Sequence, residues 1–428
     1  MLAEQGVAGR DWTWMLVLAA GLLPSGAAWA DPLGPETVKL DHGRLRPGLY
    51  PIAPGSAVDT EPAQLPFDLN WSIGLKGSYT SSSTEGGNFL TTLNPAITAR
   101  HDGRHTDLML EGSTEIARPW DEDGALGVTA LRLGLSSETA LGANTRLSGN
   151  AAIALDHPLP NSPGLDPLVE VPPRVVSGSA GLGLDRSFGR INLGVKANVE
   201  RSVYGATTRS DSGVTDNSDR NVWQADASLR AGIQITPILE VFGEAALGRD
   251  IFDKASPGLG VRTDATSTAL RGGIAGRWNG VVSASASIGL GRHDFDAAGL
   301  GDINTQLYDA SLTYSPNATV NLTASLSTNI EPTGADASGT ARVSHVAAAQ
   351  LDYRVNSWLR LRASADWSLS VLEGNGETER RRGIGAGADY ALNAHTALAA
   401  DYAYSHRDNS NTGLLDTHTV SLGVTLRR

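Results

Sequence analysis

The sequence contains no cysteine among its 428 residues, and only 6 % of the residues are aromatic and 19 % charged. Without cysteine, the chain has neither disulfide bonds nor thiolate metal ligands. No window reaches the ~18 apolar residues that a membrane-spanning helix needs. No basic run favours nucleic acid as a partner, and the formal net charge is −12. What is present is 49 glycines, together with small, hydroxylated and isolated aliphatic residues that alternate from about Leu69 to the C-terminus.

Residues 1–30 have the organisation of a secretory signal peptide. Met15–Leu23 is an apolar stretch of suitable length, and Ala28 and Ala30 supply the small residues of a cleavage site. The alternative is a buried N-terminal helix, against which the cleavage site and the proline-rich stretch behind it both argue. We therefore predict export through the inner membrane of a Gram-negative bacterium.

Residues 31–66 are rich in proline, which breaks any periodic pattern. The prolines are Pro32, Pro35, Pro47, Pro51, Pro54, Pro62 and Pro66. We expect an extended or irregular segment that lies in the periplasm or folds back into the lumen of the domain that follows. The segment could be a disordered leader, a plug of the barrel or a docking arm for a periplasmic partner, and the sequence leaves these alternatives open.

From residue 67 to residue 428 the sequence alternates with a period of two. In Ile191–Glu200 and Leu359–Val371, every second residue is apolar, and those between are charged, hydroxylated or amide residues, with one glycine. Successive side chains of a strand point to opposite sides, so each segment predicts a strand with one oily and one wet face.

The length of these segments decides between a soluble β-sandwich and a membrane barrel. They span about 10–13 residues, whereas strands of soluble proteins usually have about 5–6 and a tilted strand crosses a membrane with about 9–11. Leucine and alanine on the apolar face suit contact with lipid, but they are too small a set of bulky side chains for a packed interior. The polar face would line a water-filled lumen. The prediction is all-β: a single transmembrane, antiparallel, up-and-down β-barrel.

The connections alternate between short turns and longer polar loops, which is the asymmetry of outer-membrane barrels. The short turns are at 101–104, 140–143, 187–189, 236–237, 279–280, 315–318, 355–357 and 392–395. The longer loops are at 81–87, 119–124, 157–173, 205–219, 253–262, 296–302, 332–340, 373–379 and 408–413. Eight turns and nine loops join eighteen strands, with both ends of the barrel domain in the periplasm. Tyrosine and tryptophan residues near both kinds of connection fit aromatic girdles.

Charged residues of both signs fall on the wet face. The candidates for lining the lumen are Lys76, Arg132, Lys196, Glu200, Arg230, Glu240, Glu244, Arg271, Arg277, Arg360, Arg362 and Asp366. Charges that line an aqueous pore set its ion selectivity. The alternative is that they solvate the wall and pair across strands. Loop 157–173 has six prolines and could fold inward as a constriction or stand as a rigid surface loop.

Catalytic chemistry is not predicted. The chain has no Gly-x-Ser-x-Gly nucleophile elbow, and its nine histidines are scattered singly without a metal-ligand spacing. His157, His345 and His406 fall near loops, but the sequence shows no partner that would orient any of them. We predict neither an enzyme, nor a bound metal, nor a cofactor.

The domain resembles the putative β-barrel porin 2 family of proteobacterial outer-membrane proteins. The resemblance rests on Pro95–His105, Asp185–Arg190, Asp219–Trp223 and Ile235–Pro237, and it covers the chain from about Leu69 to the end. It implies an outer-membrane barrel, for which the family supplies no catalytic residues, and some members look linked to exopolysaccharide export. The chain departs from the usual barrel signal because it ends in Arg427–Arg428 rather than in an aromatic residue.

The predicted function is an outer-membrane pore for small hydrophilic solutes. The alternatives are a conduit for exopolysaccharide export with a periplasmic partner, and a plugged structural barrel. The expected surroundings and partners are outer-membrane lipid, lipopolysaccharide and the barrel-insertion machinery.

Overall fold

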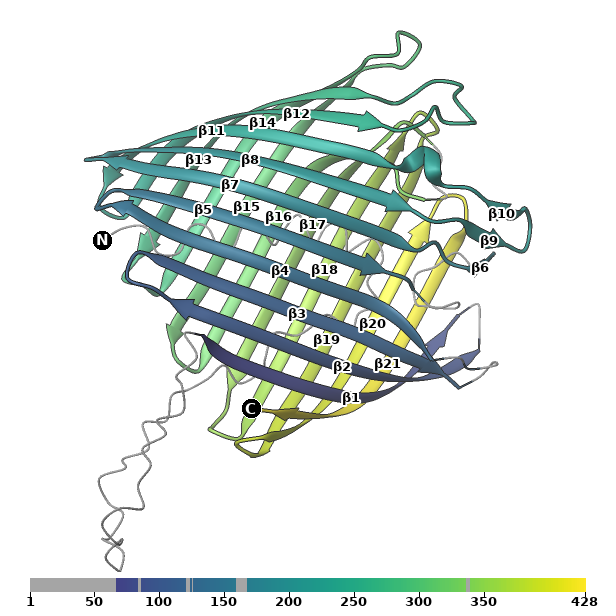
Figure 1. The fold of residues 1–428 in the computed structure, drawn as a ribbon, viewed down its shortest axis with the longest axis horizontal. Coiled ribbons are helices and arrows are strands. Elements are labelled where there is room, and N and C mark those ends of the chain that lie inside the picture. The colour runs from purple at the N-terminus through teal and green to yellow at the C-terminus, as the bar shows by residue number, and fades with distance from the viewer. Residues whose placement is uncertain (1–66, 84–85, 121–123, 125, 159–167, 336–338) are drawn as a thin grey trace, which may run out of the picture.

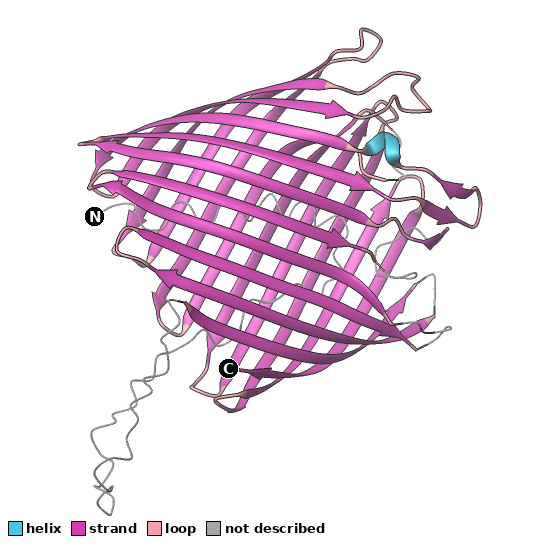
Figure 2. Cartoon of the chain, viewed as in Figure 1, coloured by secondary structure: helices cyan, strands magenta, loops and turns pink. Residues whose placement is uncertain are grey.

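A computed structural model describes residues 67–428, except 84–85, 121–123, 125, 159–167 and 336–338. The predicted signal peptide (1–30) and proline-rich segment (31–66) lie outside the described residues. Almost all of the described chain is strand, with a single 3₁₀ turn (Figure 2). Within the described ranges, no helix has the length and apolar character needed to cross a membrane.

Eighteen strands form one closed sheet (Figure 1). Their bounds are β1 (Asp68–Ser82), β2 (Gly87–Asp102), β3 (Thr106–Pro119), β4 (Gly127–Gly142), β5 (Thr145–Asp156), β7 (Val175–Phe188), β8 (Ile191–Tyr204), β11 (Val222–Thr236), β12 (Leu239–Phe252), β13 (Ala265–Trp278), β14 (Val282–Phe295), β15 (Ile303–Asn317), β16 (Val320–Pro332), β17 (Ala341–Arg354), β18 (Leu359–Glu373), β19 (Glu377–Asn393), β20 (Thr396–Asn409) and β21 (Gly413–Arg427). Each strand pairs antiparallel with the next strand of the barrel. β1 pairs with β21 from Ser72↔Arg427 to Ser82↔Thr417 and closes the sheet. The predicted eighteen-stranded antiparallel barrel is confirmed.

The register follows the predicted alternation. On β18 and β19, Ala365 opposes Ile384 on the outer face, and Asp366 opposes Gly383 on the inner face. Large apolar side chains stay exposed on the outside; Leu270, Leu290 and Leu422 are each more than 60 % exposed. A closed barrel leaves no unpaired edge and satisfies its backbone hydrogen bonds internally, so such a surface suits lipid. The main buried apolar cluster is small: Ala265, Phe295, Ile303, Ala341 and Val343.

All eight predicted short connections are tight turns at one end of the barrel, which we call the turn end. Asn279 and Gly280 illustrate the chemistry, because both have positive φ angles, of 50° and 68°. A two-residue turn of this kind matches the twist of the strands that it joins. The first and last strands of the barrel begin and end at the turn end.

At the other end, which we call the loop end, two of the predicted loops are shorter than expected. The expected loops 373–379 and 408–413 are three-residue connections, Gly374–Gly376 and Ser410–Thr412, because β18 to β21 continue further than expected. The strands of the barrel have 12–17 residues rather than about 10–13, because the pairing continues into polar sequence that lacks the apolar half of the alternation. A membrane crossing needs only about 9–11 residues, so the wall extends beyond the lipid.

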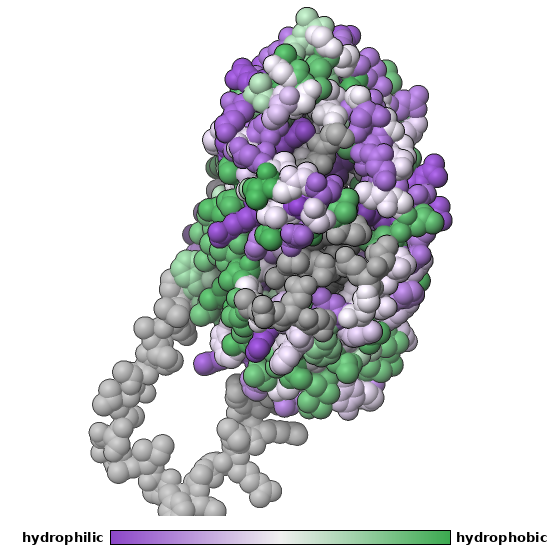
Figure 3. Space-filling model, turned by 90° about the vertical axis from the view of Figure 1, so that its right-hand side faces the viewer, coloured by the Kyte–Doolittle hydropathy of each residue, from purple (hydrophilic) through white to green (hydrophobic). Residues whose placement is uncertain are grey.

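A second, three-stranded sheet stands at the loop end (Figure 1). It consists of β6 (Val169–Val171), β9 (Thr207–Arg209) and β10 (Gly213–Thr215), and η2 (Ser218–Arg220) follows it. Figure 3 looks onto this end: hydrophilic side chains gather around much of the rim, and hydrophobic side chains gather on the flanks.

Candidate functional site: the barrel lumen

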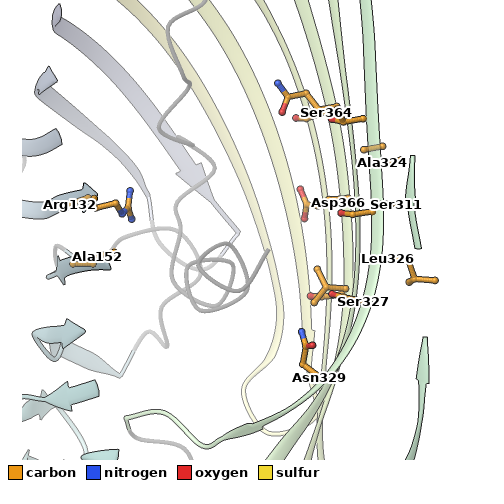
Figure 4. A pocket seen from close by; sticks show the side chains of 18 of the residues that line it. Arg132, Ala152, Ser311, Ala324, Leu326, Ser327, Asn329, Ser364 and Asp366 are labelled. Atoms are coloured by element: carbon orange, nitrogen blue, oxygen red, sulfur yellow. The ribbon is translucent and has the colours of Figure 1, made fainter. Parts of the chain in front are cut away.

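The barrel encloses a cavity of about 2570 Å³, lined by the inward faces of its strands. Figure 4 shows two facing parts of the wall. Arg132 on β4 projects from one side, and Ser311, Ser327 and Asp366 lie on the other, while Leu326 points away from the cavity. Charged and hydroxylated side chains therefore lie on both sides of the cavity.

The twelve residues proposed from the sequence all contribute to the lining of this cavity. They are Lys76, Arg132, Lys196, Glu200, Arg230, Glu240, Glu244, Arg271, Arg277, Arg360, Arg362 and Asp366. The structure separates them into charges that are paired on the wall and charges that are not.

One paired group lies on β11, β12 and β13. Arg230 Nη2 is 2.8 Å from Glu240 Oε1, and Arg271 Nη1 is 3.6 Å from Glu244 Oε1. The side-chain amide of Asn192 donates a further hydrogen bond of 2.7 Å to Glu240. Cross-strand contacts of this type hold side chains against the wall and neutralise their charges locally.

A second paired group lies on β17 to β20. Arg362 Nε is 2.8 Å from Asp389 Oδ2, and its Nη2 is 2.8 Å from Asp401 Oδ1. The Arg362 and Asp389 side chains are only 4 % and 2 % exposed. A Cβ atom on Gly387 would lie 2.1 Å from Asp401 Oδ1, so only glycine leaves room for this bridge. Arg360 forms a neighbouring pair with Asp352, at 2.5 Å.

The remaining partnered candidates are less tightly enclosed. Arg132 Nη2 is 3.1 Å from Asp156 Oδ1, with both side chains about one-third exposed. The Ser202 hydroxyl donates to Glu200 Oε1 at 3.3 Å. An ion pair this open to solvent contributes little to stability, about 0–1 kcal/mol.

Five candidates have no ion pair within the described residues. Three are the cations Lys76, Lys196 and Arg277, and two are the acids Glu200 and Asp366. Arg381 acts electrostatically on Asp366 without forming an ion pair with it. A charge without an ion-pair partner keeps more of its field in the lumen, so these five influence a passing ion more than the paired ones do.

The sequence did not reveal a contact that spans the mouth of the barrel. Arg220, on η2, donates from Nη1 to the Thr333 hydroxyl at 2.5 Å, beside the end of β16. Thr333 is 1 % exposed. Glu200 on β8 and Glu331 on β16 are also close enough to repel each other. Arg220 and Thr333 are far apart in the chain and adjoin strands that are not neighbours, so no local sequence signal could have indicated the contact.

The sequence leaves open whether the proline-rich loop 157–173 folds inward as a constriction or stands as a rigid surface loop. Residues 159–167 lie outside the described residues, and Val169–Val171 form β6, which pairs with β9 in the small sheet at the loop end. The described contact across the mouth is made by the segment that includes η2.

Arginine–aspartate clamps fix other loops at this end. Arg201 binds both carboxylate oxygens of Asp253, and Arg249 binds both of Asp296. The hydrogen bonds from the two guanidinium groups lower the pKa of Asp253 and of Asp296 below the ordinary aspartate value. Both clamps therefore persist at every pH near neutrality.

Several histidines of the described chain bond to other side chains, and His293 Nδ1 lies 2.7 Å from Ser267 Oγ. His406 Nδ1 is 2.8 Å from Asp416, a partner that the sequence did not indicate, but no serine or threonine hydroxyl within the described chain bonds to its ring. His345 bonds to Thr328, without a carboxylate to orient the ring. Among the described residues, no group of three His, Asp or Glu side chains could hold a metal ion.

The chain matches one family model and is similar to several solved structures. The family model described as "Putative beta-barrel porin 2" matches residues 68–428. Of solved structures, OpdK of Pseudomonas aeruginosa with vanillate is 11 % identical, over 84 % of this chain and 99 % of that one, with a TM-score of 0.42. OccK5 (OpdH) of the same organism is 12 % identical, over 84 % and 98 %, with a TM-score of 0.42. The FrpB iron transporter from Neisseria meningitidis is 7 % identical, over 80 % and 62 %, with a TM-score of 0.42. No curated protein matches the sequence.

Proposed function

The chain belongs to the putative beta-barrel porin 2 family, and from this premise we propose that it forms an outer-membrane pore for small hydrophilic solutes. Family and fold point to a channel rather than to an enzyme. The loop end then faces the outside and the turn end faces the periplasm, as in other outer-membrane barrels.

One observation supports the proposal: the cavity of about 2570 Å³ is lined by charged residues of both signs, some of which have no ion-pair partner within the described residues. Barrels of about 16–18 strands leave an aqueous channel unless something fills it. Arg230 and Glu240 pair with each other across neighbouring strands of the wall. The residues without an ion pair within the described chain, Lys76, Lys196, Glu200, Arg277 and Asp366, would face the solute.

Conductance tests this function directly. The full-length protein, extracted from outer membranes and inserted into a planar bilayer, is expected to give stable single-channel steps. Proteoliposomes that contain the protein should also swell in solutions of small neutral sugars, because the sugars enter through the pore. A protein that is folded by its heat-dependent electrophoretic mobility, yet silent and impermeable, would overturn the proposal in favour of a filled barrel.

The contact across the mouth predicts gating of this pore. Replacing Arg220 by alanine removes the bond to Thr333, and a hydrogen bond from a charged group contributes about 1.5–3 kcal/mol. The population of low-conductance states should fall by roughly tenfold or more, since 1.4 kcal/mol corresponds to a factor of ten. Single-channel recordings of R220A and of T333V would measure it.

Arg209→Ala is the matched control. Arg209 lies in β9, near Arg220, and bonds to both carboxylate oxygens of Asp211 in the same hairpin. This variant should gate like the unmodified protein. Identical recordings from R220A, T333V and R209A would show that the contact does not control the mouth.

A further inference from the structure

The outer face of β19, β20 and β21 carries an unusual set of polar residues near the loop end. Arg380 and Arg382 lie on β19, three and five residues beyond its first residue, Glu377. Their side chains alternate with those of Glu379 and Arg381, which pair with each other and line the lumen. Arg380 and Arg382 therefore point outward, on the same face as Ile384.

These two arginines are exposed, and neither has an ion-pair partner among the described residues. Three other outward arginines near this end have carboxylate partners: Arg201 and Arg249 are clamped by aspartates, and Arg292 contacts both Asp294 and Asp302. Arg118 instead lies over the ring of Trp120, at 4.8 Å. Arg380 and Arg382 have neither kind of partner within the described residues, so the couple is available to an anion from outside the chain.

The acidic groups near the couple do not neutralise it. Asp408 opposes Arg380 in the register but forms no ion pair with it within 4 Å. Asp416 accepts hydrogen bonds from the Tyr404 hydroxyl, at 2.7 Å, and from His406 Nδ1, at 2.8 Å. Asp416 thereby fixes the ring of His406, which opposes Arg382.

The surroundings place the couple at the edge of the lipid. One step toward the turn end, the next outward residue of β19 is Ile384, which is 57 % exposed. Trp367 opposes Arg382 on β18, and Tyr402 and His418 pack nearby with a hydrogen bond of 2.9 Å. Tryptophan and tyrosine collect at membrane interfaces, so this layer marks the boundary between acyl chains and headgroups.

The Cα atoms of two residues that are two positions apart in a strand lie about 6.7 Å apart along it, and their side chains point to the same face. Arginine binds phosphate in a bidentate manner, and it is less strongly hydrated than lysine. We propose that Arg380 and Arg382, with His406 beside them, form a binding site for the phosphorylated headgroup of an outer-leaflet lipid. The site depends on the membrane placement of the barrel but not on an open pore.

Retention of lipid by the purified full-length protein tests the site. In native mass spectrometry with a phosphorylated glycolipid of the outer leaflet, the double variant R380Q/R382Q is expected to retain at least tenfold less lipid than the unmodified protein. R380K/R382K keeps the charges and should retain most of it. Removing the phosphates from the lipid should abolish the difference between the proteins.

The matched control is R186Q/R190Q. It removes the same two charges at the turn end, where Arg186 lies exposed on the outer face and Arg190 in the adjoining turn. Equal lipid retention by R380Q/R382Q and by this control would overturn the proposal. The proposal would also be overturned if inorganic phosphate raised the unfolding temperature of the protein as much as the lipid does, because the ligand would then be a soluble anion. Conductance of each variant, measured in parallel, separates this outcome from failure of the proposed pore.

Discussion

Replacing Arg362 by methionine is expected to destabilise the barrel by about 3–5 kcal/mol, the usual cost of removing one partner of a buried ion pair. Arg362 is the shared counter-charge of Asp389 and Asp401. Because Asp389 is 2 % exposed, water cannot replace the lost guanidinium. Urea titration of folding into detergent micelles, followed by tryptophan fluorescence, would measure the change.

Two further variants separate this effect from a general loss of arginine. Arg132→Met breaks a pair that is about one-third exposed and should cost only about 0–1 kcal/mol. Combining Arg362→Met with Asp389→Leu and Asp401→Asn removes the stranded charges, and it should recover most of the lost stability. If Arg362→Met were no more harmful than Arg132→Met, the bridge would contribute little to the wall.

The sequence was sufficient to predict the wall of the barrel, because the wall depends on a local pattern. In Leu359–Val371 the polarity of each residue predicts the face of the strand on which it lies: Asp366 lines the cavity, while Ala365 faces outward. Turn chemistry is equally local: the Asn279–Gly280 pair has the positive φ angles that such a dipeptide favours. Strand number, face and turn position follow from these two signals.

The sequence could not predict which charges pair. Arg362 reaches Asp389 and Asp401 on two successive strands, and the choice depends on the register and on the space above Gly387. The contact between Arg220 and Thr333 depends on how a loop crosses the mouth, which no periodic pattern encodes. The two loops expected at 373–379 and 408–413 were too long because polar residues pair in strands as readily as they form loops once a neighbouring strand continues.

Ion selectivity should respond to the unpaired charges far more than to the paired ones. Neutralising Lys76, Lys196 and Arg277 together as glutamines is expected to shift the pore toward cations. A single charge 4 Å from an ion contributes about 1 kcal/mol in water, which is roughly a fivefold change in relative permeability. Reversal potentials under a salt gradient would show the shift as a change toward the value for an ideal cation channel.

Two further variants complete the test of selectivity: one removes a negative charge, and the other removes an ion pair without changing the net charge. Asp366→Asn removes an unpaired acid and should shift the reversal potential toward anions. The pair Arg132→Gln with Asp156→Asn removes two charges that already cancel at 3.1 Å, so it should leave selectivity nearly unchanged. Equal shifts from paired and unpaired sites would mean that the whole wall, rather than its uncompensated charges, sets the field in the pore. The order expected from the structure is a shift toward cations for the triple variant, no shift for the pair, and a shift toward anions for Asp366→Asn, because a charge without an ion-pair partner keeps more of its field in the lumen.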